Sequence, residues 1–257
     1  MLGAKMKQLK SYITENHRVK YSNADNNNML KPMEAARWFQ DIFLRQDEVL
    51  GIERTSDFTW ILLNYDMNIY KYGKIGDKVK IETYPYSFNR FYGNRMFFLK
   101  DENDNVMIEA KTRWLLVEKD TLKIKKVTKE IAEVYDLHEI EKGKGFEVDN
   151  IEDKVFIDVE KKPLQIRRSD LDINNHVNNT LYFSYFYDYI DKEILDKYIP
   201  YKIQLTYKKQ ITIDDEPYVY TKDIVEDEQY YTNVKICNDK NEIYTLIKIL
   251  WKKKDEC

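Results

Sequence analysis

One short segment of the chain holds side chains that could carry out acid–base chemistry. Residues 167–179 read RRSDLDINNHVNN and place Asp172, Asn174 and His176 at alternate positions. In an extended segment alternate side chains project to the same side, so a carboxylate, an amide and an imidazole could face one pocket. An aromatic-rich helical stretch follows, and free backbone N–H groups at such a junction can stabilise a developing anion. One interpretation of this segment is therefore a catalytic site.

The same residues also have a purely structural interpretation. Asn178 or Asn179 would cap the following helix, because asparagine is a favoured N-cap residue. Asp172 and Asn174 would close turns, and His176 would be a structural histidine. The spacing by itself does not decide between the two interpretations.

The elements that would position this segment occur twice along the chain. Apolar residues recur at helical spacing from Met33 to Leu50, with Pro32 near the start and Gly51 as a stop signal. Strand-like stretches follow, and the second half repeats this order with a helix over Thr180–Lys197. Its four predicted strands lie near 201–213, 217–225, 229–237 and 242–251. A duplicated unit is the simplest explanation.

An offset of 148 residues aligns the asparagines that precede the two helices. Ala24 and Asn28 then fall opposite Asp172 and His176, and neither can bear a carboxylate or transfer a proton at neutral pH. Catalysis would therefore belong to the second half. Between the halves charged residues dominate and glycines interrupt the pattern, so we place the boundary near Lys144.

Composition argues against several classes of protein. The 257 residues carry a formal net charge of −3, so no global field recruits nucleic acid or an anionic membrane, and no basic cluster accompanies a nucleic-acid motif. The chain has only two cysteines, Cys237 and Cys257, so we expect no disulfide framework and a location in the reducing cytoplasm. His17, His138 and His176 lack the spacing of metal ligands. We expect neither a signal peptide nor a membrane span.

Three stretches resemble one known family, in the same order along most of the chain. They read MLKPMEAARWFQDI, IRRSDLDINNHVNNTLYF and LTYKKQI. They are similar to the acyl-acyl-carrier-protein thioesterases of plants and bacteria. The resemblance implies an α+β fold of two tandem hotdog domains, each a long helix wrapped by an antiparallel sheet. It also implies hydrolysis of fatty acyl-acyl-carrier-protein thioesters to free fatty acid and carrier-protein thiol, in fatty acid biosynthesis, with no cofactor and no metal.

The resemblance assigns different work to the two domains. The N-terminal hotdog domain, 1–144, would shape the acyl-chain pocket without catalysing, with Trp38, Phe39 and Phe43 as contributors. The C-terminal hotdog domain, 145–257, would be catalytic.

Within the catalytic domain we expect a division of roles. Asp172 would activate water or attack directly, Asn174 would position water or donate to the oxyanion, and His176 would transfer the proton. The family carries a glutamate where this chain has Gln210, beside a cysteine where it has Ile211. Gln210 forms hydrogen bonds but cannot act as a base, so Asp172 would carry more of the catalysis.

An acyl carrier protein is acidic, so a basic surface must receive it. Four basic residues are candidates because they are expected near Asp172, Asn174 and His176, although each could be an ordinary solvated side chain: Arg167, Arg168, Lys208 and Lys209. A homodimer is left open. Two alternative functions are hydrolysis of acyl-coenzyme A, since the hotdog scaffold accommodates both carriers, and a non-catalytic acyl-binding protein, which the 21 Tyr, the 11 Phe and Gln210 would suit.

Overall fold

The computed structural model describes residues 10–52, 57–138, 140–141 and 146–256. The chain forms two compact units. The first comprises Met1–Leu63 and Tyr70–Glu147, and the second comprises Asn64–Ile69 and Val148–Cys257. The boundary that the sequence predicts, near Lys144, lies outside the described residues.

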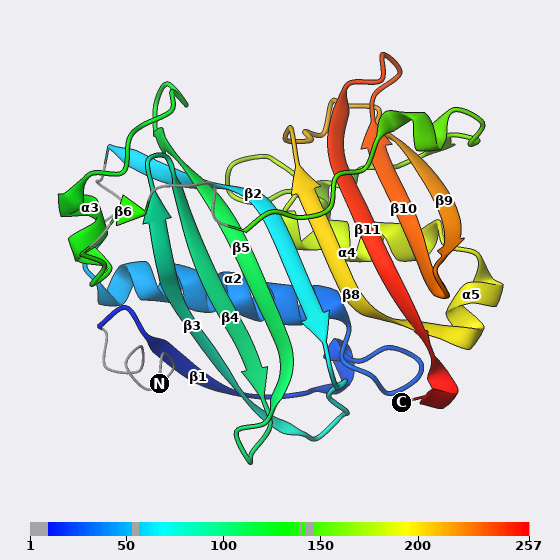
Figure 1. Cartoon of the computed structure of the whole chain (residues 1–257), viewed down its shortest axis with the longest axis horizontal. Helices are drawn as coiled ribbons and strands as arrows, with labels where there is room; N and C mark the ends of the chain where they lie inside the picture. Colours follow the sequence, from blue (N-terminus) through cyan, green and yellow to red (C-terminus); the bar gives the residue numbers. More distant parts are fainter. Residues whose placement is uncertain (1–9, 53–56, 139, 142–145, 257) are drawn as a thin grey trace. The chain divides into compact units, whose positions relative to one another are not determined.

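The first unit is a long helix against an antiparallel sheet (Figure 1). Its strands lie in the order β1-β3-β4-β5-β2, and β6 pairs parallel with β3. The elements are β1 (Ile13–Arg18), η1 (Tyr21–Asn23), α2 (Pro32–Val49), β2 (Phe58–Ile69), β3 (Lys78–Asn89), β4 (Tyr92–Lys100), β5 (Val106–Glu118), α3 (Lys129–Val134) and β6 (Ile140–Glu141). Only Phe58–Leu63 of β2 belongs to this unit.

Helix α2 confirms the first predicted helix to within one residue at each end. It begins with Pro32 in its first turn, where the missing N–H is not needed, and Gly51 follows its end with a φ of +65°. It contacts β1 and β3, and Figure 1 shows it crossing one face of the sheet. Phe39 is buried there and stacks on Phe97 of β4 with ring centroids 5.1 Å apart. This face is therefore the core of the unit.

The second unit has the same plan with a broken helix. Its sheet has the order β8-β11-β10-β9-β7, and Asn64–Asn68 of β2 pair antiparallel with β8. The elements are η2 (Asp153–Phe156), β7 (Lys162–Pro163), η3 (Arg168–Asp170), η4 (Asn179–Leu181), α4 (Tyr182–Tyr185), η5 (Phe186–Asp188), α5 (Lys192–Lys197), β8 (Tyr198–Tyr207), β9 (Tyr218–Glu226), β10 (Gln229–Cys237), β11 (Ile243–Lys253) and η6 (Lys254–Glu256).

Two expectations for this unit are wrong in detail. The helix predicted over 180–197 is interrupted, because Asp191 has an extended backbone, with a ψ of 137°, where it caps α5. The aromatic residues before it have modest helix propensity, so packing rather than local preference decides their conformation. The strand predicted over 201–213 ends at Tyr207. The backbone N–H groups of Lys208 and Lys209 both donate to the carbonyl oxygen of Tyr244, at 2.8 and 3.2 Å, which breaks the regular ladder.

Candidate active site

Residues 171–177 form a tight loop, not the extended stretch that the alternation of Asp172, Asn174 and His176 predicts. Leu171 and Val177 form an antiparallel bridge at its base. The Asp172 N–H donates to the His176 carbonyl oxygen at 2.8 Å, and Asn175 has a φ of +60°. Asparagine tolerates this left-handed conformation better than most residues. The expectation that three side chains project to one side of a strand is therefore wrong.

The carboxylate of Asp172 binds the backbone of this loop. Its Oδ1 accepts from the N–H of Asn174 at 2.7 Å and from the N–H of His176 at 3.4 Å. Asp172 is half-buried, whereas Asn174 is exposed. The turn-closing role that the structural interpretation gives to Asp172 is therefore present.

The first unit contains the same loop. Ala24 and Leu30 form the bridge at its base, and the Asp25 N–H donates to the Met29 carbonyl oxygen at 2.8 Å. Oδ1 of Asp25 accepts from the N–H groups of Asn27 and Met29, each at 2.9 Å. As in the second loop, the asparagine before position 29 has a φ of +60°. The two loops thus match bond for bond.

This match corrects the alignment of the two halves. Asp25 corresponds to Asp172, which makes the offset 147 residues rather than 148. The first half keeps the carboxylate, contrary to expectation, and Met29 stands where the second half has His176. Because residues 26–28 are all asparagine, the sequence alignment of the two halves can be displaced by one residue and still pair asparagine with asparagine. The shared aspartate was the signal that could have fixed it.

His176 is the group that sets the second loop apart. Its side chain is half-buried, and its Nδ1 is buried with no hydrogen-bond partner among the described residues. The N–H of Val177 donates to the Ile211 carbonyl oxygen at 2.8 Å, which holds the chain after β8 beside the loop. Gln210 is therefore one residue from this contact, and its side chain is exposed in a segment without strand structure.

Side chains also fix the start of the helical segment that follows the loop. Oδ1 of Asn178 accepts from the backbone N–H and the hydroxyl of Thr180, at 2.9 and 2.7 Å, which confirms the expected cap. The Tyr207 hydroxyl donates to the Asn179 carbonyl oxygen at 2.9 Å. The loop is thereby anchored to β8 as well as to the segment after it.

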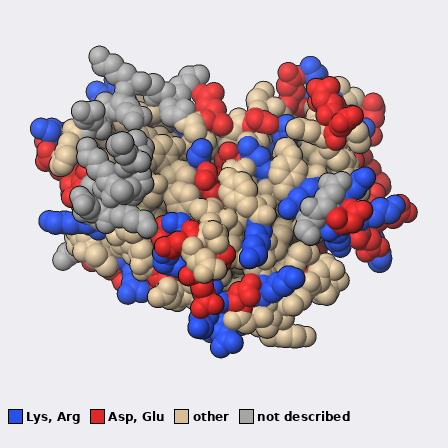
Figure 2. Space-filling model, turned by 60° about the horizontal axis from the view of Figure 1, so that its bottom comes forward, with Lys and Arg blue, Asp and Glu red and all other residues tan. Residues whose placement is uncertain are grey.

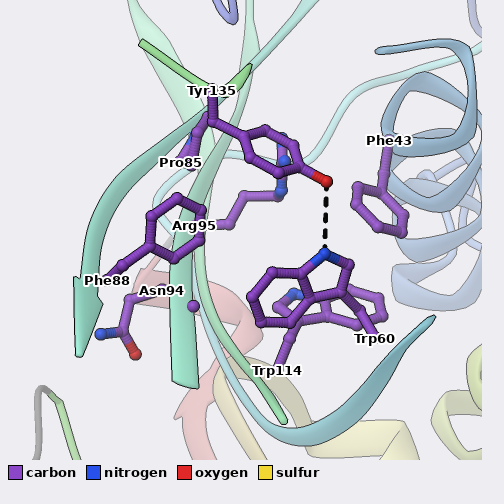
Figure 3. Close-up of a pocket in the computed structure, with 9 residues that line it drawn as sticks. Phe43, Trp60, Pro85, Phe88, Asn94, Arg95, Trp114 and Tyr135 are labelled. Carbon is purple, nitrogen blue, oxygen red and sulfur yellow. Dashed lines mark hydrogen bonds between the residues drawn. The ribbon is translucent and has the colours of Figure 1, made fainter. Parts of the chain in front are cut away.

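An aromatic cavity lies in the first unit (Figure 3). Its volume is about 20 Å³, room for roughly one water molecule. Phe43 lines it and approaches Trp114 with ring centroids 4.7 Å apart, whereas Trp38 and Phe39 are not among the lining residues. The lining is formed by Phe43, Trp60, Pro85, Phe88, Gly93, Asn94, Arg95, Trp114 and Tyr135.

A buried charged cluster borders this cavity, and the sequence interpretation missed it. The guanidinium of Arg95 donates to Thr83 Oγ1 at 3.1 Å and to Gln46 Oε1, and it lies 4.8 Å from the ring centroid of Phe43. Burial lowers the pKa of Arg95 to about 10. Burial also raises the pKa of Asp47 to about 6, although the nearby Arg95 opposes this.

Tyr135 connects this cluster to the cavity. Its hydroxyl accepts from Trp60 Nε1 at 3.2 Å, and it donates to Asp47 Oδ1 at 3.5 Å. Figure 3 shows Tyr135, Trp60 and Phe43 converging on the same space. Sequence alternation along β4 held one usable signal, since Arg95 shares a strand face with the buried Phe97.

The four basic candidates for a partner surface are all exposed, and they belong to the second unit. Lys209 forms an ion pair with Glu242 at 2.8 Å. Arg167, Arg168 and Lys208 make no ion pair with any described residue. Figure 2 shows acidic and basic side chains interspersed over the face that it draws.

In the described part of the chain, no helix has the length and apolar character needed to cross a membrane. Among the same residues, no three His, Cys, Asp or Glu side chains come together in the manner of metal ligands.

Comparison with known proteins identifies relatives of the chain. The chain matches the acyl-ACP thioesterase N-terminal domain over residues 10–135 and the acyl-ACP thioesterase C-terminal domain over residues 154–253. It is 30% identical over 165 residues to oleoyl-acyl carrier protein thioesterase 1, chloroplastic, of Arabidopsis thaliana, an alignment that covers 61% of this chain and 46% of that protein. The chain thus spans about half the length of the curated relatives that it matches.

Solved structures show the same fold over nearly the full length. A crystal structure described as an oleoyl thioesterase from Lactobacillus plantarum has a TM-score of 0.88 and 20% identity, covering 98% of this chain and 99% of that one. The 12:0-ACP thioesterase from Umbellularia californica has a TM-score of 0.81 and 15% identity, covering 95% and 94%. These likenesses confirm the α+β tandem hotdog fold. Because both domain models match in order and together take in most of the residues, the chain belongs to the acyl-ACP thioesterase family.

Proposed function

We propose that this protein hydrolyses fatty acyl-acyl-carrier-protein thioesters to free fatty acid and carrier-protein thiol, at the loop that contains His176. Family membership supports the reaction class. The observation that carries the choice of site is the comparison of the two loops. They share an aspartate, two asparagines and their backbone hydrogen bonds, but only the second loop has a histidine, His176, where the first has Met29. An imidazole can accept the proton of the attacking water and return it to the leaving thiolate, which a thioether cannot do.

The chemistry follows from these groups. Water attacks the carbonyl carbon and gives a proton to His176, the tetrahedral oxyanion collapses, the C–S bond breaks, and the proton passes to the leaving thiolate. Nδ1 of His176 is buried and has no partner among the described residues, so no described protein group competes for it. The exposed amides of Asn174 and Gln210 are proposed to donate to the oxyanion or to position the water.

Asp172 belongs to the same site in one of two roles. It could attack or act as base, or it could hold the loop through the hydrogen bonds of its Oδ1. The two roles predict different results when Asp172 is replaced by asparagine, which keeps an acceptor oxygen but has no negative charge.

We assign the acyl chain to the aromatic cavity of the first unit. Apolar and aromatic walls with a few polar groups are typical of such ligand sites. The present volume of about 20 Å³ holds no acyl chain, so side chains such as Phe43 and Trp114 must move when substrate binds. Phe43 is thus the one of three expected contributors that lines the cavity.

The carrier is proposed to be an acidic acyl carrier protein that docks on Arg167, Arg168 and Lys208, with Lys209 partly neutralised by Glu242. We further propose a cytoplasmic location, in keeping with Cys237, which is free and buried. Raising ionic strength should raise KM for the carrier-protein substrate, because exposed charges are screened within about 10 Å at 0.1 M salt.

A thiol-release assay on matched acyl-carrier-protein and acyl-coenzyme A substrates tests the function. His176→Met gives the second loop the residue of the first loop and should lower kcat/KM by at least about 100-fold, the lower end of what a positioned base contributes. Met29→Ala is the matched control in the first loop and should leave kcat/KM near the wild-type value. Faster turnover of acyl-coenzyme A would favour that alternative. Fatty-acid binding without thiol release would instead identify an acyl-binding protein.

A further inference from the structure

The two loops form an internal comparison that bears on the role of their aspartates. Asp25 and Asp172 each use Oδ1 to accept from the backbone N–H groups two and four residues further on. The first loop has Met29 where the second has His176, so its aspartate has no imidazole to assist. The aspartate is therefore explained by the needs of the loop alone.

The physical need is clear from the backbone. A residue in the left-handed conformation turns the chain so that two nearby N–H groups point inward, away from any regular ladder. An Asp or Asn side chain two residues earlier satisfies such groups, and hydrogen bonds to a carboxylate are stronger than neutral ones. Without the acceptor both N–H groups would lose their partner.

The same bonds fix His176 from both sides. Its N–H donates to the Asp172 side chain at 3.4 Å, and its carbonyl oxygen accepts from the Asp172 N–H at 2.8 Å. The next residue, Val177, is tied to Ile211 at 2.8 Å. The backbone of residue 176 is thus held in place, and with it the Cα–Cβ bond from which the imidazole projects.

We infer that Asp172 is a positioning residue, which holds His176 through the loop backbone and neither attacks the thioester nor takes the proton from water. The inference rests on the proposed function and revises the role that the sequence suggests for Asp172. His176 is then the base of the loop. The water proton moves to its imidazole, hydroxide adds to the carbonyl carbon, the C–S bond breaks, and the imidazolium returns the proton to the thiolate sulfur.

Four variants of the whole chain separate the two roles. Asp172→Ala removes the acceptor and should lower kcat. Asp172→Asn keeps an acceptor at the Oδ1 position, so its kcat should lie within about tenfold of wild type. The midpoint of the acid limb of its pH–rate profile should also stay in place. A carboxylate that acts as base would instead be worth about 10²–10⁴-fold. Asp25→Asn and Asp25→Ala make the same changes in the first loop. They should not change kcat, although Asp25→Ala should lower Tm about as much as Asp172→Ala does.

A second measurement does not depend on turnover. The chain has three histidines, so the ring resonances of His176 can be assigned by NMR with a His176→Met reference. They should keep their position in Asp172→Asn and shift in Asp172→Ala. A folded Asp172→Asn variant that loses 100-fold or more in kcat would overturn the inference, and so would an unshifted His176 signal in Asp172→Ala. Absence of thiol release by the wild-type protein would count against the proposed function instead, and the NMR result would still judge the positioning role.

Discussion

Replacing Asp47 with asparagine should make the protein more stable, and the gain should depend on pH. Asp47 lies on α2 beside the buried Arg95 cluster, and burial raises the pKa of its carboxyl from 3.8 to about 6. The folded state therefore prefers the protonated form. The folded state is therefore most stable, as far as Asp47 is concerned, below about pH 4, where the carboxyl is protonated. This stability is lost as pH rises through 6, because the folded chain must then bury a charge.

The size of the effect follows from the pKa. Each pKa unit corresponds to 1.36 kcal/mol, so a change from 3.8 to about 6 costs the wild-type protein about 3 kcal/mol at neutral pH. Asparagine has nearly the same shape, avoids this cost and can still accept from the Tyr135 hydroxyl. The difference in free energy of unfolding between Asp47→Asn and wild type should grow by about 2–3 kcal/mol from pH 4 to pH 7 and stay level above that.

Urea denaturation at half-unit pH intervals, followed by tryptophan fluorescence, measures this difference. Three of the four tryptophans, Trp38, Trp60 and Trp114, belong to the first unit, so the signal reports mainly on the unit that contains Asp47. Glu48→Gln is the control, because it removes an exposed carboxylate from the next position of the same helix. A difference that stays within about 0.5 kcal/mol across the range, or that falls as pH rises, would show that Arg95 compensates the charge and would refute the reasoning.

Two further changes test the cavity and the missing glutamate. Gly93→Ala should cost about 1–3 kcal/mol in urea denaturation and weaken fatty-acid binding, since its Cβ would lie 2.7 Å from Phe88 Cε1 and 3.3 Å from Trp60 Cη2; a cost below about 0.5 kcal/mol would mean that these rings yield freely. Gln210→Glu places a carboxylate one residue from the contact between Ile211 and the catalytic loop, and it should raise kcat severalfold in the thiol-release assay; no gain would indicate that His176 works without a second acid–base group.

The sequence alone determined much of the architecture. Apolar residues at helical spacing and a proline near the start placed α2 to within one residue, and the repeat of helix and strands identified the duplication. These features are local, because each depends on residues a few positions apart. The motif around His176 likewise identified the family, as the matches over both halves confirm.

The tertiary structure decided what depends on contacts between distant segments. Asp47, Arg95 and Tyr135 come from a helix, a strand and the end of α3, and no pattern of neighbouring residues relates them. The loop at 171–177 was also beyond the sequence interpretation, because alternation describes an extended chain and the hydrogen bonds of Asp172 fold it back. A run of asparagines has no apolar pattern to fix its register, so only the paired backbone bonds showed that Asp25 and Asp172 are equivalent.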